Sequence, residues 1–213
     1  KYTKEDGLPF IPTEQEIDAL ITAASPKMAT LLQLLKETGA RIGEIQKLKW
    51  THIDLERRTV YITAEKGSNA RILPISEKLK AMLHAIQTTN DRVFPTSKQG
   101  LRNTLECMRN RTAQKLNNPR LKSIHFHTLR HWKGTMEYHK TKDFFYVKEI
   151  LGRKSTQSTQ IYIHIDRTLF HNLPPEEFHV RVAKKEEEIT DLIQAGYEYV
   201  LQKDNLAYFQ KRK

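Results

Sequence analysis

The sequence predicts an α+β fold that is predominantly α, and three observations support this. Most segments place apolar residues at the spacing of an amphipathic helix, between capping residues at one end and glycine at the other. Two short β-branched segments within residues 59 to 75 flank a turn-forming loop, which is typical of a β-hairpin. After residue 174 the pattern becomes a strand, a helix and a second hairpin. The prediction is therefore a helical bundle with a small antiparallel sheet, followed by a strand-helix-hairpin appendage.

Three helices are expected in the first part of the chain. Thr13 and Glu16 stand at capping-box spacing before an apolar stripe, which predicts the start of the first helix. Ser25 suits the N-cap of the second helix, and Gly39 suits its C-terminal cap. A short third helix is expected within residues 40 to 50.

The middle of the chain predicts the hairpin and two further helices. The segments TVYITA and ARILPI form the two strands, and EKGSN joins them. Ser76 begins the next helix, and a long helix runs from about Ser97 to Leu116. Cys107, on that long helix, is expected to be a buried and inert thiol. The inward face of the long helix is expected to consist of Leu101, Leu105, Met108 and Leu116.

Three more helices are predicted before the chain changes character. They correspond to TLRHWKGTMEYH, FFYVKEILG and STQSTQIYIHI, with Gly152 ending the second and Ser155 beginning the third. The proline pair at positions 174 and 175 then marks a boundary. It separates a main domain, residues 1 to 173, from the appendage, residues 174 to 213.

The charge of the chain points to a polyanionic partner. Lys and Arg number 36 against 25 Asp and Glu, for a formal net charge of +11. From residue 174 onward seven basic side chains meet eight acidic ones, so the surplus lies within residues 1 to 173. The polyanion is expected to dock there, although composition alone supports a role in solubility equally well.

No part of the sequence predicts a membrane or secretory protein. No apolar run approaches the roughly 20 residues needed to cross a bilayer, and the first residues lack the apolar segment of a secretory signal. The single cysteine cannot form an internal disulfide, which is typical of a reducing compartment. A cytoplasmic location is expected.

Three basic side chains stand where local structure would hold them rigidly. Arg41 follows a turn into a helix, Lys66 lies at the predicted hairpin tip, and Arg130 falls in the first turn of its predicted helix. The N–H groups of a helix start attract anions, which applies to Arg130 and to the nearby His127. Two arginines can hold the non-bridging oxygens of a phosphodiester, and a lysine can protonate a leaving alkoxide. These residues therefore predict phosphodiester chemistry.

Tyr162 is the candidate nucleophile of this site. A phenol with an ordinary pKa near 10 is a weak nucleophile at neutral pH until cations or a base favour the phenolate. Arg153, nine positions earlier and just beyond a helix end, could supply one such cation. No metal ion or cofactor is needed for this chemistry.

Four ordered motifs carry these candidates: TGARIGEIQKL around Arg41, AEKGSNARILPIS around Lys66, HTLRH beginning at His127, and LGRKSTQSTQIYIH around Tyr162. In order and spacing they resemble the tyrosine recombinases, the integrases of phages, plasmids and other mobile elements. The resemblance covers residues 12 to 170 and implies a mostly helical catalytic domain with a small antiparallel sheet. It also implies a DNA strand transferase, chemically like type IB topoisomerases, that works through a covalent 3′-phosphotyrosyl intermediate.

The resemblance assigns a role to each matching residue. Arg41 and Arg130 would bind the scissile phosphate. Lys66 would protonate the departing 5′-hydroxyl, and His127 would assist proton transfer. Tyr162 would attack the phosphorus. These roles imply site-specific recombination, either integration or excision, without ATP.

Supporting residues and one departure complete the comparison with this family. Glu44 would buttress Arg41 across one helical turn, and His131 would support the site. Most family members read LGH where this chain reads LGR, so Arg153 replaces a histidine that normally helps to hold the phosphate. An arginine still donates hydrogen bonds but cannot share a proton near neutral pH. Lys154 is an alternative for this role.

The predicted partner is a double-stranded DNA recognition site. The three side chains Lys98, Arg102 and Arg109 gather at one edge of the long helix, where they could follow the phosphates, and Lys154 could add a contact. A solvated helix face is an equally good explanation of the three. The family also implies self-association, as a tetramer on paired sites. A helical DNA-clamping domain that usually precedes the catalytic domain is expected to be absent here, and the appendage resembles extensions of some archaeal integrases.

Two other functions compete with recombination. A DNA-binding protein on the same scaffold could position or repress without cutting, but it would not need the complete set of candidate catalytic residues. A nuclease could use metal-bound histidines, since His127 and His131 share a helix face. His125, however, is expected to lie before that helix, so no metal ion is predicted.

Overall fold

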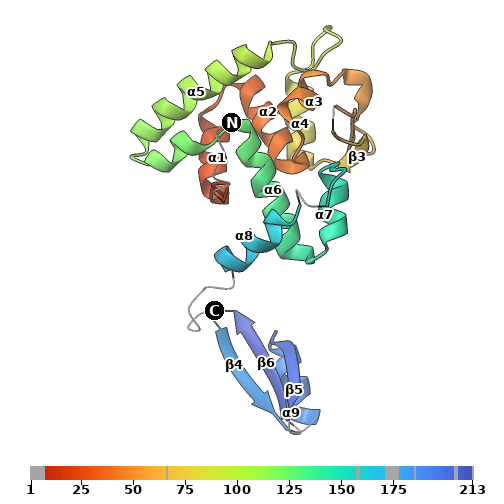
Figure 1. Cartoon of the computed structure of the whole chain (residues 1–213), viewed down its shortest axis with the longest axis vertical. Helices are drawn as coiled ribbons and strands as arrows, with labels where there is room; N and C mark the ends of the chain where they lie inside the picture. The colour runs from red at the N-terminus through yellow and green to blue at the C-terminus, as the bar shows by residue number, and fades with distance from the viewer. Residues whose placement is uncertain are drawn as a thin grey trace, which may run out of the picture. The chain divides into compact units, whose positions relative to one another are not determined.

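A computed structural model describes residues 8–65, 67–156, 159–170, 178–184, 186–203 and 206–212. The chain divides into two compact units, Lys1–Asp166 and Arg167–Lys213 (Figure 1). The proline pair expected to mark the domain boundary, Pro174 and Pro175, lies outside the described residues. Helix α8 (Ile161–Phe170) runs across the division between the units.

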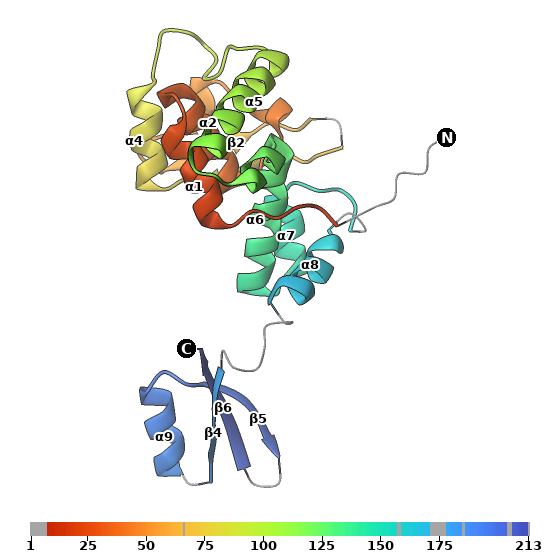
Figure 2. The ribbon, with the colours of Figure 1, turned by 90° about the vertical axis from the view of Figure 1, so that its left-hand side faces the viewer.

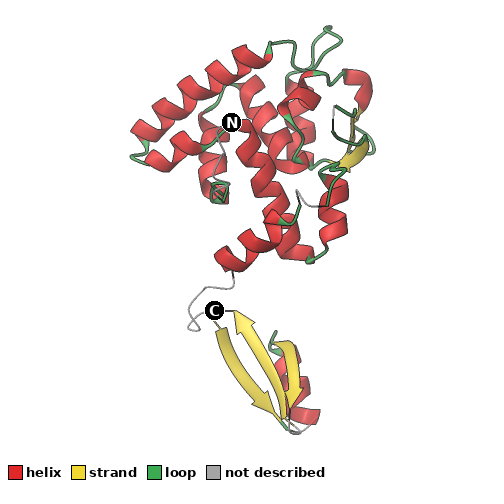
Figure 3. Ribbon diagram, in the orientation of Figure 1, coloured by secondary structure: helices red, strands yellow, loops and turns green. Residues whose placement is uncertain are grey.

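The first unit is mostly helical, with one small sheet (Figure 3). Apart from α8, its elements in chain order are α1 (Glu14–Ala23), α2 (Pro26–Thr38), α3 (Ile42–Gln46), η1 (Trp50–His52), β1 (Ile53–Asp54), β2 (Thr59–Ile62), β3 (Arg71–Pro74), α4 (Glu77–Ala85), α5 (Lys98–Lys115), η2 (Pro119–Ser123), α6 (Phe126–Thr141) and α7 (Phe144–Ile150). This arrangement confirms the predicted predominantly α fold with a small antiparallel sheet.

Helix α2 forms the centre of the first unit. Leu31, Leu34 and Leu35 have no exposed surface, and the helix packs against α1, α4 and α6 (Figure 2). The helix is buried on most sides, with polar residues such as Gln33 and Lys36 among its buried positions. Its C-cap, Gly39, adopts a left-handed φ of 59°, which ends the helix as predicted and begins the turn that carries Arg41.

The small sheet has the strand order β1-β2-β3, with antiparallel neighbours. Tyr61 pairs with Ile72, and both side chains are exposed, whereas Val60 and Ile62 on the other face are fully buried. This alternation is the ordinary pattern of a sheet with one solvated face. The predicted hairpin is therefore confirmed, although its expected tip residue, Lys66, lies outside the described residues.

Three expectations about helix positions are wrong. Helix α8 begins at Ile161 rather than at Ser155, because hydrogen-bonded turns through Thr159 precede it. Helix α6 begins at Phe126, after the N-cap His125, which places Arg130 beyond the first turn. Leu116 is 51% exposed, because it is the C-cap where α5 ends.

Cys107 is exposed, which contradicts the expected buried thiol. It follows the buried Leu105 by two residues, and two residues along a helix correspond to a rotation of about 200°. Its side chain therefore lies on the opposite face of α5. The apolar residues near Cys107 in the sequence suggested that it would be buried, but they belong to a different face of the helix.

The second unit contains a strand, a helix and a hairpin, in the predicted order. These are β4 (Phe178–Ala183), α9 (Glu186–Gln194), β5 (Glu198–Lys203) and β6 (Leu206–Arg212). The strands are antiparallel in the order β4-β6-β5. A small core of Ala183, Ala207 and Phe209 lies between the sheet and residues that include Ile189 and Leu192 of α9.

Candidate active site

Arg41 enters the site from the turn between α2 and α3. It is the N-cap of α3, and its side chain is 29% exposed. The preceding Gly39 has no room for a side chain, because a Cβ there would come within 2.7 Å of Leu151. Glycine thus permits both the left-handed turn and the close approach of the segment that follows α7.

Arg130 reaches the same place from α6 and is only 1% exposed. Its Nη1 donates to the carbonyl of Gly39 at 2.8 Å, and its Nη2 donates to the carbonyl of Leu151 at 2.7 Å. The guanidinium therefore joins the end of α2 to the end of α7. Burial and the nearby charge of Arg41 lower the pKa of Arg130 to about 9, which still leaves it cationic at neutral pH.

Tyr162, in the first turn of α8, is fully buried against α6 and Arg153. A Cβ on Gly134 would lie 2.5 Å from Cζ of the tyrosine, so only glycine at this position of α6 admits the ring. Nη2 of Arg153 donates to the tyrosine hydroxyl at 2.8 Å, and the guanidinium carbon lies 5.1 Å from the ring centroid. Arg153 thus lies where it could act as the expected cation beside Tyr162, and its role in the site stays a prediction.

The pKa of the Tyr162 hydroxyl is set by opposing effects. Burial raises this pKa, whereas the positive charges of Arg153, Arg130 and Arg41 lower it. Burial dominates, so the pKa lies above its ordinary value and the phenol is protonated at neutral pH. The three guanidiniums nevertheless provide the field that would stabilise a phenolate or a bound anion.

Two histidines of α6 lie beside the tyrosine. The ring centroids of His127 and His131 are 4.7 Å apart, and those of His131 and Tyr162 are 6.1 Å apart. Burial and neighbouring positive charges lower both pKa values, to about 4 for His131. His127 is open to solvent on one side, and both histidines are neutral near pH 7.

Several side-chain nitrogens of the cluster lack a hydrogen-bond partner within the described part of the chain. They are Nη1 of Arg41, Nε of Arg130 and the ring Nδ1 of His131, all of which are buried. Buried polar groups in folded proteins are nearly always hydrogen-bonded, so such atoms call for an explanation. A cationic cluster with unused donors is suited to an anionic ligand.

Glu44 supports Arg41, but its main partner is a residue that sequence reasoning missed. The carboxylate is 1% exposed, accepts from the backbone N–H of Arg41 at 2.8 Å, and lies 3.7 Å from the Arg41 guanidinium. Arg71 of β3 donates to its two oxygens at 3.2 and 2.9 Å. One signal in the sequence could have revealed this pair: Arg71 occupies the inward phase of a strand whose next residue, Ile72, points outward.

The residues that follow Lys66 approach the end of α7. Ser68 forms an isolated β-bridge with Arg153, and the N–H of Asn69 donates to the carbonyl of Gly152 at 2.9 Å. Both ends of the hairpin connection are thus described, and one of them is fixed beside Arg153. Lys66 itself stays a predicted member of the site.

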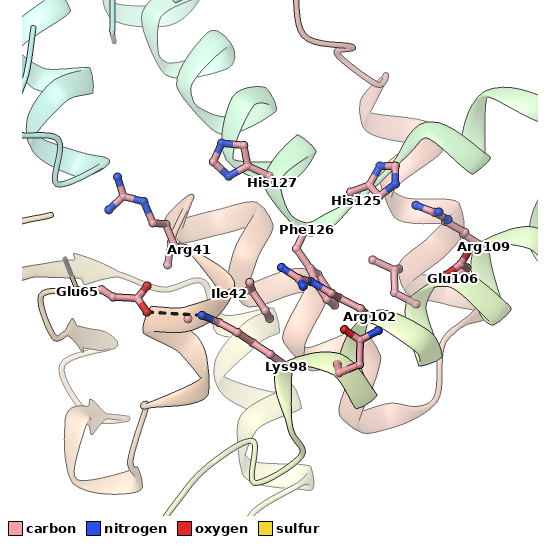
Figure 4. Close-up of a pocket in the computed structure, with 14 residues that line it drawn as sticks. Arg41, Ile42, Glu65, Lys98, Arg102, Glu106, Arg109, His125, Phe126 and His127 are labelled. Carbon is pink, nitrogen blue, oxygen red and sulfur yellow. Dashed lines mark ion pairs between the residues drawn. The ribbon is translucent and has the colours of Figure 1, made fainter. Parts of the chain in front are cut away.

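A groove of about 730 Å³ extends from the arginine cluster along α5. Figure 4 shows Arg41 and His127 at one end and Arg109 at the other, with Lys98 and Arg102 between them. Lys98 pairs with Glu65 at 3.6 Å, and Arg109 donates to the carbonyl of Ile124 at 2.9 Å. The three basic residues of α5 therefore line one groove with two candidate catalytic residues.

Lys154 is exposed and does not line this groove. His125, considered above as a metal ligand, instead contacts the carbonyl of Ser123 through Nδ1 at 2.9 Å. Among the residues that the structure describes, no group of three His, Cys, Asp or Glu side chains is placed to hold a metal ion. No helix within the described ranges is long and apolar enough to cross a membrane.

Comparison with known proteins connects this arrangement to one family. The model of the phage integrase family matches residues 12–168. The chain is 30% identical over 142 residues to the tyrosine recombinase XerC of Pseudomonas putida, covering 64% of this chain and 47% of that protein. It is 28% identical over 175 residues to XerC of Bacillus subtilis, covering 74% of this chain and 55% of the relative. The chain thus spans about half the length of these relatives.

Solved structures agree at the level of the fold. The XerA recombinase is 26% identical with a TM-score of 0.59, over 82% of this chain and 67% of that one. The catalytic domain of bacteriophage HP1 integrase is 22% identical with a TM-score of 0.56, over 76% of this chain and 92% of that domain. The chain belongs to the phage integrase family, whose matched segment contains every candidate catalytic residue.

Proposed function

We propose that this chain carries the catalytic domain of a site-specific DNA recombinase that cuts and rejoins DNA through a covalent 3′-phosphotyrosine. One observation supports this most strongly: the Tyr162 hydroxyl accepts a hydrogen bond from Arg153 inside a cluster with Arg130 and Arg41. A phenol among guanidiniums, at the end of a basic groove, suits attack on a phosphodiester.

The arginines bind the scissile phosphate and stabilise its charge. In the transition state negative charge grows on the non-bridging oxygens, where guanidinium donors are most effective. Arg130 is fixed by two carbonyls, so it costs little reorganisation when the charge develops. Arg41 is partly exposed at the groove and meets the phosphate first. Arg153 takes the position that a histidine occupies in most members of the family.

In the displacement one bond forms and another breaks, and each transferred proton has a donor and an acceptor. The phenolic oxygen of Tyr162 forms a bond to phosphorus, and the bond from phosphorus to the 5′-oxygen breaks. Lys66 donates a proton to the departing 5′-oxygen, and neutral His127 accepts the proton that the phenol loses. Rejoining reverses these steps with another 5′-hydroxyl. Because the phosphotyrosine retains the bond energy, ligation needs no ATP.

Tyr162 must become accessible before it can react. It has no exposed surface, so DNA cannot reach its oxygen in the arrangement described. Either α8 moves, or the residues that cover the ring move, when DNA enters the groove. In this proposal cleavage therefore includes an opening step that exposes Tyr162.

Double-stranded DNA is the proposed partner. Among the structural relatives, the XerH recombinase was solved bound to its difH substrate and the Tn1549 integrase in complex with transposon end DNA. Lys98, Arg102 and Arg109 would contact phosphates along the groove, with Lys154 as a further contact. Assembly into a tetramer on paired sites and a cytoplasmic location in a prokaryote complete the proposal.

A DNA-binding protein that does not cut is less well supported. Such a protein needs a basic groove but has no use for a tyrosine buried against three arginines. The two functions differ in one product, which is a covalent protein–DNA adduct.

Covalent capture tests the proposal. Full-length protein is incubated with a randomised duplex library that carries a nick, so that the short cleaved strand diffuses away. Denaturing electrophoresis then separates adducts from free DNA. The wild-type protein is expected to form an adduct that Tyr162→Phe abolishes, whereas Tyr146→Phe, a change at an exposed tyrosine, should leave it intact. Specific DNA binding without any adduct would support the non-cutting alternative.

A further inference from the structure

We infer that Arg71 is a positioning residue that holds the candidate catalytic groups in their mutual arrangement. This inference rests on the proposed function and concerns a residue that does not itself touch the DNA. Arg71 lies on β3, and only 5% of its side chain is exposed. A buried arginine in a four-residue strand calls for a purpose beyond packing, because burying a charge is costly unless it is fully paired.

The guanidinium of Arg71 contacts two separate segments and the connection of its own hairpin. Nη1 and Nη2 donate to the carboxylate of Glu44 in α3 at 3.2 and 2.9 Å. Nε donates to the carbonyl of Ile150 at the end of α7 at 2.8 Å. Nη1 also reaches the carbonyl of Asn69 in the hairpin connection at 3.2 Å. One side chain therefore joins α3, α7 and the hairpin.

Each of these segments carries a candidate catalytic residue. Glu44 accepts from the backbone of Arg41 at 2.8 Å, so its position determines where Arg41 leaves the turn. The carbonyl of Ile150 lies three residues before Arg153. Asn69 follows Lys66 by three residues in the hairpin connection. Displacing Arg71 would thus disturb the positions of Arg41 and Arg153 together.

Gly152 shows how tightly these segments meet. Its φ is 60°, and a Cβ there would lie 2.6 Å from Nη1 of Arg71 and 2.7 Å from the carbonyl oxygen of Asn69. Glycine is therefore required both by the backbone conformation and by the guanidinium. The turn before Arg153 is shaped around Arg71.

Arg71 also keeps Arg41 available for the phosphate. Burial by itself would raise the pKa of Glu44, but hydrogen bonds from Arg71 and from the backbone of Arg41 outweigh burial and lower it. The carboxylate is consequently ionised and would attract any nearby cation. With Arg71 present, the Arg41 guanidinium stays 3.7 Å from Glu44. Without Arg71, the carboxylate would draw Arg41 closer and away from the groove.

Lysine cannot reproduce this arrangement. A guanidinium is a planar fork that serves a carboxylate and two carbonyls at fixed angles, whereas an ammonium is a compact point charge. Arg71→Lys keeps the charge that Glu44 needs but loses the simultaneous contact with Ile150 and Asn69. This variant therefore separates charge compensation from positioning.

The test compares three variants of the full-length protein on the captured DNA site. They are Arg71→Lys, Arg71→Met, and the double variant Arg71→Met with Glu44→Gln. In the double variant no buried carboxylate is left without its cation, and the Gln oxygen can still accept from the backbone of Arg41. The matched control is Arg57→Met, since 85% of the Arg57 side chain is exposed. Three quantities are measured: DNA affinity, the single-turnover cleavage rate at saturating DNA, and the melting temperature.

If Arg71 is a positioning residue, its replacement should lower the cleavage rate without lowering the affinity for DNA. Arg71→Lys should cleave about 100-fold more slowly than wild type, because misplacement of catalytic groups by about 1 Å has an effect of that order. The double variant should regain the melting temperature that Arg71→Met loses, yet remain slow. The control should match wild type in all three measurements.

Two results would overturn the inference. The first is that Arg71→Lys cleaves at the wild-type rate. The second is that the double variant recovers the wild-type cleavage rate. Either result would mean that Arg71 only compensates the charge of Glu44. If the proposed function itself is wrong, the result is distinguishable from these two, because the wild-type protein then forms no covalent adduct with DNA. If Arg71→Met does not fold, the lysine and double variants still decide the question.

Discussion

At the scale of single residues, the contact between Arg153 and Tyr162 is the most informative feature. The guanidinium donates to the phenolic oxygen at 2.8 Å and also lies over the ring, 5.1 Å from its centroid. A histidine has a shorter side chain and one ring nitrogen per side, so it could not make both contacts from the same backbone position. The arginine thus makes a pair of contacts with Tyr162 that a histidine at this position could not reproduce.

Replacing Arg153 tests its part in the reaction. Arg153→Ala should slow single-turnover cleavage by about 100-fold, the usual effect of removing one donor to a developing oxyanion. Arg153→His should restore part of the rate and add a pH dependence near pH 6.5, where histidine ordinarily titrates. The pH profile of the cleavage rate between pH 5.5 and pH 9 measures this. Unchanged rate and pH profile in both variants would remove Arg153 from the site.

His131 predicts how stability depends on pH. Burial and the charges of His127, Arg153 and Arg130 lower its pKa from 6.5 to about 4. The unfolded chain therefore binds more protons than the folded chain between these values, and stability must fall as the pH drops from about 6.5 towards about 4. Urea unfolding across this range should show a shallower loss in His131→Asn than in wild type. Equal slopes would mean that His131 does not carry the effect.

The candidate catalytic residues and the support of Arg41 by Glu44 were predictable from the sequence, but the arginine that holds Glu44 was not. Arg41, His127, Arg130 and Tyr162 stand in motifs with a readable chemical purpose. The motifs assign no role to Arg71, and two of its partners, Glu44 and Ile150, lie far from it in the chain. Long-range hydrogen bonds depend on the tertiary fold, which local patterns do not specify.

At the scale of elements, α8 is held against α6 by a buried carboxylate. Asp166 lies four residues after Tyr162, one helical turn along α8, and is 2% exposed. It contacts Nδ1 of His139 at 2.7 Å and accepts from Nζ of Lys142 at 2.6 Å. Burial alone would raise the pKa of Asp166, but these hydrogen bonds outweigh it and lower the pKa. The position of Tyr162, the proposed nucleophile, thus depends on an ion-paired anchor.

Asp166→Asn should weaken this anchor. A neutral amide keeps the shape but loses the charge-assisted bonds, so the free energy of unfolding should fall by about 1–3 kcal/mol. Hydrogen exchange of the α8 amides should accelerate more than exchange elsewhere. Because the folded-state pKa is lowered, the stabilisation is present above the ordinary pKa and lost as the pH falls through the folded value. Asp91→Asn, which breaks an exposed pair with Lys49, is the control. Equal effects at both sites would argue against an anchor.

Element boundaries show where sequence patterns stop being sufficient. The capping box at Thr13 and Glu16, the Gly39 cap and the Ser76 cap all formed as predicted, since each depends on residues within one turn. The start of α8 at Ile161 was missed, because the polar residues before it form turns instead of a helix. Local chemistry thus determines strong caps, whereas an uncapped start depends on packing.

At the scale of the whole molecule, the distribution of charge is the feature that matters for DNA. The net charge is +11, and three basic side chains of α5 line the groove that ends at Arg41. The sequence predicted the charge surplus and the edge on which Lys98, Arg102 and Arg109 gather. It could not predict that α5 and the start of α6 enclose a shared groove, because this depends on how the helices pack.

The groove predicts a definite salt dependence. Each side chain that contacts a DNA phosphate contributes about 0.9 to the slope of log K against log salt concentration. Changing Lys98 and Arg102 together to Gln should therefore reduce that slope by about 2, while cleavage at saturating DNA stays near the wild-type rate. Arg111→Gln, on a different face of α5 and away from the groove, is the control. An unchanged slope in the double variant would place the DNA elsewhere.

Mass spectrometry of the captured adduct would show directly whether Tyr162 becomes joined to DNA. The adduct is digested with nuclease and protease, and the peptide that retains a nucleotide is sequenced. Wild-type protein should carry a 3′-linked nucleotide on Tyr162, and Tyr162→Phe should give no modified peptide. A nucleotide on any other residue, or an adduct that persists in Tyr162→Phe, would contradict the proposed role of Tyr162.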